Sequence, residues 1–201
     1  MNFFLNRERI ANVFLALSYA FFFFNNFVFL SKDFRVSVFI LAVFNGLLLI
    51  ISLLRRKPQR VSFAPLDVIV TFVGTYSVFF LVGIADATEI LFLQGLGIAG
   101  LLISLAGVFS LNESFGLLPA NRGIVQNGIY RIIRHPIYAG YFVSNSCFLL
   151  QNFSSRNLIL FSCFAVCETL RLLREEKLLS QQPDYAHYMQ TVRWRLIPYV
   201  W

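Results

Sequence analysis

Six long apolar stretches dominate this sequence. Each consists mainly of Leu, Ile, Val, Phe and Ala, and most approach the roughly 20 residues that an α-helix needs to cross a bilayer. None shows the alternation over about ten residues that marks a transmembrane β-strand. The stretches are Ile10–Leu30, Val36–Leu54, Leu66–Ala85, Ile90–Leu111, Ile137–Leu150 and Leu158–Leu173. The sequence therefore predicts an all-α fold, a polytopic bundle of about six transmembrane helices.

The composition excludes the other broad classes of protein. Hydrophobic residues make up 58% of the chain and charged residues only 13%, whereas soluble domains carry roughly 25% charged residues. A disordered chain would be poor in apolar residues. Three Cys in 201 residues are too few for a disulfide scaffold. The sequence is thus that of an integral membrane protein.

The distribution of basic residues predicts the orientation in the membrane. With six spans and a cytoplasmic N-terminus, fourteen of the 17 Lys and Arg residues fall in cytoplasmic segments. The outer loops then hold only Lys32, Arg35 and Arg156, and the loop with Asp86 and Glu89 holds none. Because basic residues accumulate on the cytoplasmic side, we expect both termini there. The net charge of +7 indicates contact with anionic lipids rather than nucleic acid, since no basic stripe lies on a soluble face.

Polar residues gather in two of the expected cytoplasmic segments, residues 112–140 and residues 168–198. They flank a predicted helical hairpin whose two legs each climb roughly 20 Å at 1.5 Å per residue. Such a hairpin places His135 and Tyr138 level with Arg171 and Glu175. On the second leg, Glu168, Arg171 and Glu175 share one helix face. Two interpretations stay open for that face, a structural ion-pair ladder or the lining of a polar cavity.

The two polar segments resemble a known family. Residues 127–140 read Asn-Gly-Ile-Tyr-Arg-Ile-Ile-Arg-His-Pro-Ile-Tyr-Ala-Gly, similar to the G-x-Y-x-x-x-R-H-P-x-Y-x-G core of the isoprenylcysteine carboxyl methyltransferase superfamily. That superfamily also contains phospholipid N-methyltransferases. Its second core is similar to the pair Glu175-Glu176, the tyrosines Tyr185 and Tyr188, and the stretch Arg-Trp-Arg-Leu-Ile-Pro that ends at residue 198. Residues 115–125 look like those of bacterial members.

The resemblance covers about residues 105–200 and implies a function. We expect residues 105–201 to form a methyltransferase core with a cytoplasmic-side pocket for S-adenosylmethionine, and residues 1–104 to supply the N-terminal transmembrane helices. The methyl acceptor would be a lipophilic small molecule, a prenylated group or a lipid. The resemblance implies that these residues bind the cofactor: Tyr130, Arg134, His135, Tyr138, Gly140, Glu175 and Glu176.

The chemistry of the acceptor stays open at this level. A carboxylate is already a nucleophile and needs a cation to hold it, for which Arg171 and Arg193 are the candidates. An amine must lose a proton, which Glu175, Glu176 or His135 could accept. The catalytic candidates are therefore Arg171, Glu175 and Arg193. No metal is expected, because Cys163 and Cys167 lack a nearby His or acid.

Two other functions remain possible for the same motifs. Sterol reductases that use NADPH share an R-H-P-x-Y-x-G segment, a Glu-Glu pair and an ending like Arg-Leu-Ile-Pro-Tyr, although they are usually longer and have more spans. A non-enzymatic membrane protein that keeps the fold is the third possibility. The sequence leaves the oligomeric state open.

Overall fold

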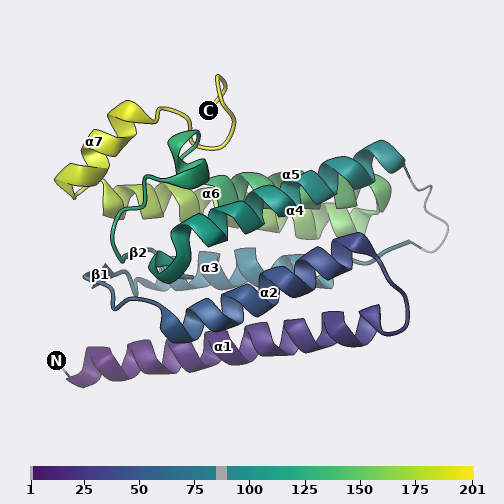
Figure 1. Cartoon of the computed structure of the whole chain (residues 1–201), viewed down its shortest axis with the longest axis horizontal. Helices are drawn as coiled ribbons and strands as arrows, with labels where there is room; N and C mark the ends of the chain where they lie inside the picture. Colours follow the sequence, from purple (N-terminus) through teal and green to yellow (C-terminus); the bar gives the residue numbers. More distant parts are fainter. Residues whose placement is uncertain (1, 85–89) are drawn as a thin grey trace. The chain divides into compact units, whose positions relative to one another are not determined.

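The computed structural model of the chain describes residues 2–84 and 90–201 and is mostly helical (Figure 1). Its residue contacts divide the chain into two units, Met1–Arg56 and Lys57–Trp201. Residue 104, where the expected N-terminal part ends, lies inside a helix of the second unit. Asp86 and Glu89 of the expected outer loop lie outside the described residues, as does Ala85.

The first unit is a pair of antiparallel helices. Helix α1 (Asn2–Leu30) and helix α2 (Val36–Leu54) lie side by side (Figure 1). In the connection between them, Arg35 Nε lies 2.8 Å from Asp33 Oδ2. A Cβ on Gly46 of α2 would lie 3.2 Å from the ring of Phe23 on α1. A glycine at this position therefore allows the two helices to approach closely.

The second unit contains the remaining elements. In chain order they are β1 (Arg60–Val61), α3 (Pro65–Ser77), the 3₁₀ helix η1 (Val78–Phe80), α4 (Leu91–Leu111), η2 (Asn112–Ser114), β2 (Ala120–Asn121), η3 (Gly128–Arg131), α5 (Pro136–Gln151), α6 (Ser155–Leu179) and α7 (Pro183–Thr191). Helix α4 packs on α5, and α3 packs on α6, which also contacts α5. The strands form a two-stranded antiparallel pair in which Arg60 is opposite Asn121.

Small residues form the contact between α4 and α5. A Cβ on Gly140 of α5 would collide with the Gly100 carbonyl and the Ser104 side chain of α4. The Ser104 hydroxyl donates to the Ile137 carbonyl at 3.1 Å. Small residues four apart on α4 therefore let the start of α5 lie directly against it.

The turn between α5 and α6 is capped by polar side chains. Ser154 is the N-cap of α6, and its hydroxyl accepts a hydrogen bond from the Asn157 N–H at 3.2 Å. The Asn157 side chain also donates to the carbonyls of Val82 and Asn152 at 2.8 and 2.7 Å. These bonds satisfy backbone groups that would otherwise be unpaired at the turn.

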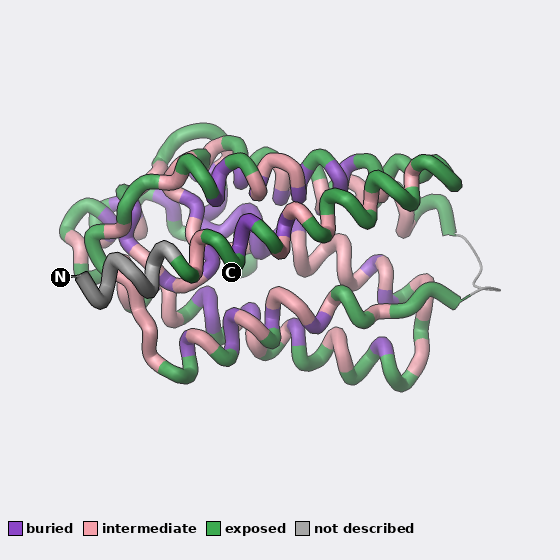
Figure 2. The backbone as a smooth tube through the Cα atoms, turned by 90° about the horizontal axis from the view of Figure 1, so that it is seen from below, coloured by how far each residue is buried: buried purple, intermediate pink, exposed green. Residues whose placement is uncertain are grey.

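Among the described residues, three helices are long and apolar enough to cross a membrane: Ile10–Leu30, Val36–Leu54 and Leu91–Ser114. Many of their Phe, Leu and Val side chains are exposed, and Figure 2 shows exposed segments recurring along the helices. The other three expected spans also correspond to helices. However, these three differ from a regular apolar span of about 20 residues. Helix α3 with η1 is shorter than the expected stretch, and α5 has only 16 residues. Helix α6 extends past Leu173 to Leu179 and carries several charged side chains.

Candidate functional site

The residues that precede α5 lie against residues 192–201. Pro136 occupies the first turn of α5. An N–H group at this position would have no acceptor within the helix, so the lack of one in proline costs no hydrogen bond. The backbone N–H groups of Arg134 and His135 donate to the carbonyls of Trp194 and Arg195, both at 2.9 Å. These two bonds hold Arg134 and His135 between α5 and the C-terminal segment.

Glu176 of α6 is the centre of a buried charged group that we call the Glu176 cluster, formed with Arg134, His135 and Arg195. Glu176 Oε1 accepts a hydrogen bond from Arg134 Nε at 2.8 Å and lies 3.1 Å from His135 Nε2. Its Oε2 accepts from Arg195 Nε at 2.8 Å. Glu176 itself is only 4% exposed. Both oxygens of this carboxylate are thus used within the chain.

The charge of Glu176 is strongly stabilised by these partners. Burial by itself would raise the pKa of the carboxyl group. The hydrogen bonds from His135, Arg134 and Arg195 outweigh burial and lower the pKa of Glu176 to about 2. Glu176 is therefore ionised at neutral pH and is a poor proton acceptor.

Arg134 joins the Glu176 cluster to the C-terminal segment. Besides its bond to Glu176, its Nη1 donates to the carbonyls of Val192 and Arg193, both at 2.9 Å. The side chain is buried, so each of these bonds replaces water that the guanidinium has lost. Arg134 thus holds together α6, the start of α5 and residues 192–193.

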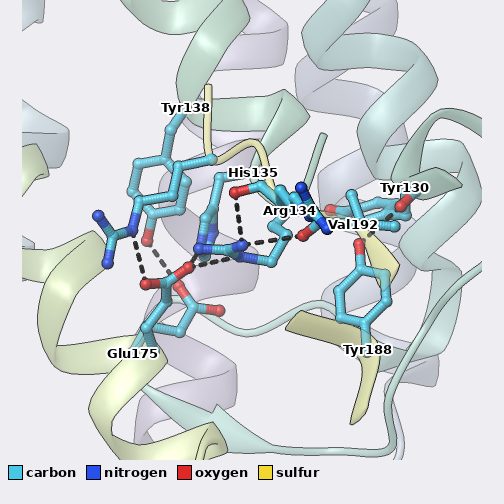
Figure 3. Close-up of polar contacts among 10 residues, drawn as sticks. Tyr130, Arg134, His135, Tyr138, Glu175, Tyr188 and Val192 are labelled. Atoms are coloured by element: carbon cyan, nitrogen blue, oxygen red, sulfur yellow. Dashed lines mark hydrogen bonds and ion pairs between the residues drawn. The ribbon is translucent and has the colours of Figure 1, made fainter. Parts of the chain in front are cut away.

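Tyr138 and Glu175 form a second polar pair one helical turn further along α5. The Tyr138 hydroxyl donates to Glu175 Oε2 at 2.8 Å (Figure 3). The rings of His135 and Tyr138 are 5.6 Å apart and nearly perpendicular. Unlike Glu176, Glu175 is only half-buried. Among the described residues, Tyr138 is its one hydrogen-bonding side chain, which leaves its other oxygen open to a ligand.

A buried ion pair connects this site to α3. Arg171 Nη1 lies 3.2 Å from Glu168 Oε1 and 3.4 Å from the Thr75 hydroxyl of α3. The guanidinium carbon of Arg171 is 5.4 Å from the centre of the Tyr138 ring, within the range of a cation–π contact. The position of Tyr138 therefore depends on a charged pair that α3 and α6 enclose.

Three buried tyrosines contact one another where α7 meets η3: Tyr130 of η3, and Tyr185 and Tyr188 of α7. The Tyr188 hydroxyl donates to the Tyr130 carbonyl at 2.6 Å (Figure 3). Tyr185 packs against Tyr188 with ring centres 5.6 Å apart. Burial raises the pKa of all three tyrosines, and for Tyr130 the charge of Glu175 adds to this effect. Their hydroxyls are neutral at physiological pH.

The structure brings together most of the residues expected in the site. The expected meeting of the two polar segments is confirmed by the bonds of Glu176 to Arg134 and His135 and of Glu175 to Tyr138. Arg171 joins them through the Tyr138 ring. For the Glu168–Arg171–Glu175 face, the structure shows an ion pair between Glu168 and Arg171, while Glu175 bonds to Tyr138 instead.

Two predicted site residues have other surroundings. Gly140 faces α4, where only a residue without a side chain fits, so close helix packing accounts for this glycine. The Arg193 side chain is exposed, and only its backbone carbonyl contacts Arg134. The roles expected for them in cofactor and acceptor binding stay predictions.

Two residues that the sequence did not single out also take part in this region. Arg195, not Arg193, is the residue of the C-terminal segment that bonds to Glu176. The sequence alone could not show which of these two arginines, only two residues apart, bonds to Glu176. Buried Asp67 of α3 pairs with Arg174 and accepts a hydrogen bond from Ser62. An isolated acid in an apolar stretch, two residues after Pro65, is the only sequence signal for it.

A scan against protein-family models gives no match for this chain, and a search of curated proteins gives none. Among the side chains that the structure describes, no group of three or more His, Cys, Asp and Glu residues is placed to hold a metal ion. The resemblance to the methyltransferase superfamily therefore stays a prediction that depends on the two motifs and on the site that they form.

Proposed function

We propose that the protein is an integral membrane methyltransferase that transfers a methyl group from S-adenosylmethionine to a lipophilic acceptor. The observation that carries this proposal is the hydrogen bond between Tyr138 and Glu175, next to the His135–Glu176 contact. It joins the two segments whose motifs resemble the superfamily, although they are far apart in the sequence. Residues that would serve one ligand are thus neighbours in space.

The chemistry of these side chains suits S-adenosylmethionine. When bound, the cofactor supplies a methyl group on a positively charged sulfur, and it also carries an ammonium and a carboxylate. Glu175 offers an available carboxylate oxygen for a cationic group, and the aromatic face of Tyr138 can stabilise a neighbouring positive charge. Glu176 and Arg134 satisfy one another, so their proposed contribution is to hold Glu175 and Tyr138 in place.

Methyl transfer itself requires mainly positioning. The acceptor oxygen or nitrogen forms a bond to the methyl carbon as the carbon–sulfur bond breaks, and the electron pair stays on sulfur. Holding the two reactants in line can supply much of the rate enhancement. For a carboxylate acceptor, Arg171 and Arg193 are the cations proposed to hold it. For an amine acceptor, Glu175 and His135 are the bases proposed to accept the proton.

A membrane location favours a lipophilic acceptor. The six-span arrangement with both termini and the site at the cytoplasmic face is part of this proposal, and the distribution of basic residues supports it. In that arrangement the Glu176 cluster lies where α6 leaves the bilayer. A substrate with an apolar tail would then reach the site from the lipid while its polar group faces Glu175 and Arg171.

Calorimetric titration of the detergent-solubilised protein tests the cofactor. We expect binding of S-adenosylmethionine and none of NADPH, and we expect labelled methyl transfer into a lipid extract. Glu175→Gln should weaken binding, whereas the exposed charge variant Asp184→Asn should bind like the wild type. Binding of NADPH alone would indicate a reductase, and binding of neither ligand would reopen the non-enzymatic alternative.

A further inference from the structure

Tyr185 of α7 has a buried hydroxyl group without a hydrogen-bond partner. The residue is only 4% exposed, and its hydroxyl is one of the few buried side-chain atoms in the described part of the chain that makes no hydrogen bond. Leaving a buried hydroxyl unpaired costs free energy that folding must offset. Such groups in native proteins frequently meet a ligand or an ordered water.

Tyr188, one turn further along α7, provides the contrast. Its hydroxyl donates to the Tyr130 carbonyl at 2.6 Å, and this bond anchors α7 to η3. The rings of Tyr185 and Tyr188 pack edge to face, 5.6 Å apart. Packing therefore accounts for both rings, but an internal hydrogen bond accounts for only one of the two hydroxyls.

The surroundings of the Tyr185 hydroxyl belong to the candidate site. Burial raises its pKa, and the negative charges of Glu176 and Glu175 raise it further, while Arg134 lowers it. The hydroxyl is therefore neutral, and Tyr185 packs in one cluster with Val192, whose carbonyl accepts a hydrogen bond from Arg134. Both oxygens of Glu176 are already bonded within its cluster. Glu175 is the nearby acid with an oxygen left for a ligand.

We propose that the Tyr185 hydroxyl is a ligand-binding group of this site and accepts a hydrogen bond from a ligand ammonium whose charge Glu175 balances. This inference rests on the proposed function, in which the ligand is S-adenosylmethionine and the ammonium is its α-amino group. An ammonium fits because it donates up to three hydrogen bonds and is attracted by the carboxylate of Glu175. A ligand carboxylate would be repelled by Glu175, and Arg134 already uses its Nε and Nη1 inside the chain.

The pair Tyr185→Phe and Tyr188→Phe tests the proposal, because each variant removes one hydroxyl and keeps the ring. Thermal unfolding and calorimetric titration with S-adenosylmethionine are measured for both variants and the wild type. Tyr185→Phe should unfold at the wild-type temperature or above and bind about tenfold more weakly, as expected for a lost hydrogen bond to a charged group. Tyr188→Phe should unfold at a lower temperature and, while folded, bind like the wild type.

Decarboxylated S-adenosylmethionine, which keeps the ammonium but lacks the carboxylate, identifies the group that Tyr185 contacts. Tyr185→Phe should weaken its binding by the same factor as for the parent cofactor. If the loss disappears with this ligand, the hydroxyl binds the carboxylate and the proposal is wrong. Equal affinities of wild type and Tyr185→Phe for S-adenosylmethionine would overturn the inference alone. A wild-type protein that does not bind S-adenosylmethionine would overturn the proposed function together with it.

Discussion

Arg134 Nε donates to Glu176 Oε1 at 2.8 Å across 42 residues of sequence. The bond joins the segment before α5 to the end of α6, and both side chains are buried. With Arg195 on the second oxygen of Glu176, it also binds residues 192–201 to the same point. The Glu176 cluster thus holds three separate segments of the second unit around Glu175 and Tyr138.

Glu176→Gln should destabilise the protein. The substitution leaves the buried Arg134 and the partly exposed Arg195 without their counter-charge, and removing one partner of a buried ion pair costs about 3–5 kcal/mol. Thermal unfolding in detergent measures the loss, with Asp184→Asn as a charge-removing control at an exposed position. Unchanged stability of Glu176→Gln would mean that the cluster does not hold these segments together.

The stability of the wild type should fall in acid because of the same residue. The pKa of Glu176 is about 2 in the folded protein, below its ordinary value of 4.5. A lowered pKa stabilises the fold fully above the ordinary value, and this contribution is lost as the pH falls toward 2. Unfolding curves between pH 7 and 3 should show the wild type approaching Glu176→Gln below about pH 4.5. A constant difference between the two proteins down to pH 3 would contradict this assignment.

Glu175→Gln should affect ligand binding rather than folding. Glu175 is half-buried and its single side-chain bond, from Tyr138, is retained by an amide oxygen. We expect unfolding close to that of the wild type and an affinity for S-adenosylmethionine at least about tenfold lower, since a charged partner is lost. The loss of affinity should exceed the loss of stability for Glu175→Gln, whereas Glu176→Gln should mainly lose stability. Strong destabilisation of Glu175→Gln would instead give it a structural role.

Gly74→Ala should disturb the contact between α3 and the Glu168–Arg171 pair. A Cβ at this position would lie 2.5 Å from Glu168 Oε1, so the carboxylate must move. Overpacking of this kind costs about 1–3 kcal/mol. Gly95→Ala is the matched control, because a Cβ there has nothing within 4 Å, and alanine is favoured in helices by up to about 1 kcal/mol. Equal unfolding temperatures for the two variants would show that α3 does not restrain Glu168.

The helical elements follow from local features that the sequence displays directly. All six apolar stretches correspond to helices. A long apolar segment favours the α-helix, because a helix makes all of its backbone hydrogen bonds within the segment and needs no partner element. Local residues also mark the helix starts: Pro136 is the first residue of α5, and Ser154 caps α6, which begins three residues before the expected Leu158. The meeting of His135 and Tyr138 with α6 could also be predicted, since two legs of similar length are joined by a short turn. These features depend on residues that are near one another in the chain.

The partners within the site could not be predicted in the same way. Two adjacent acids, Glu175 and Glu176, have the same chemistry, yet their positions 100° apart around α6 give one of them three partners and the other an open oxygen. Arg193 and Arg195 differ likewise, because the path of the C-terminal segment turns only one of them toward Glu176. The sequence therefore determines the helices and the kinds of side chain near the site. Which side chains pair and which stay available for a ligand depends on helix rotation and long-range packing, and only the folded chain sets these.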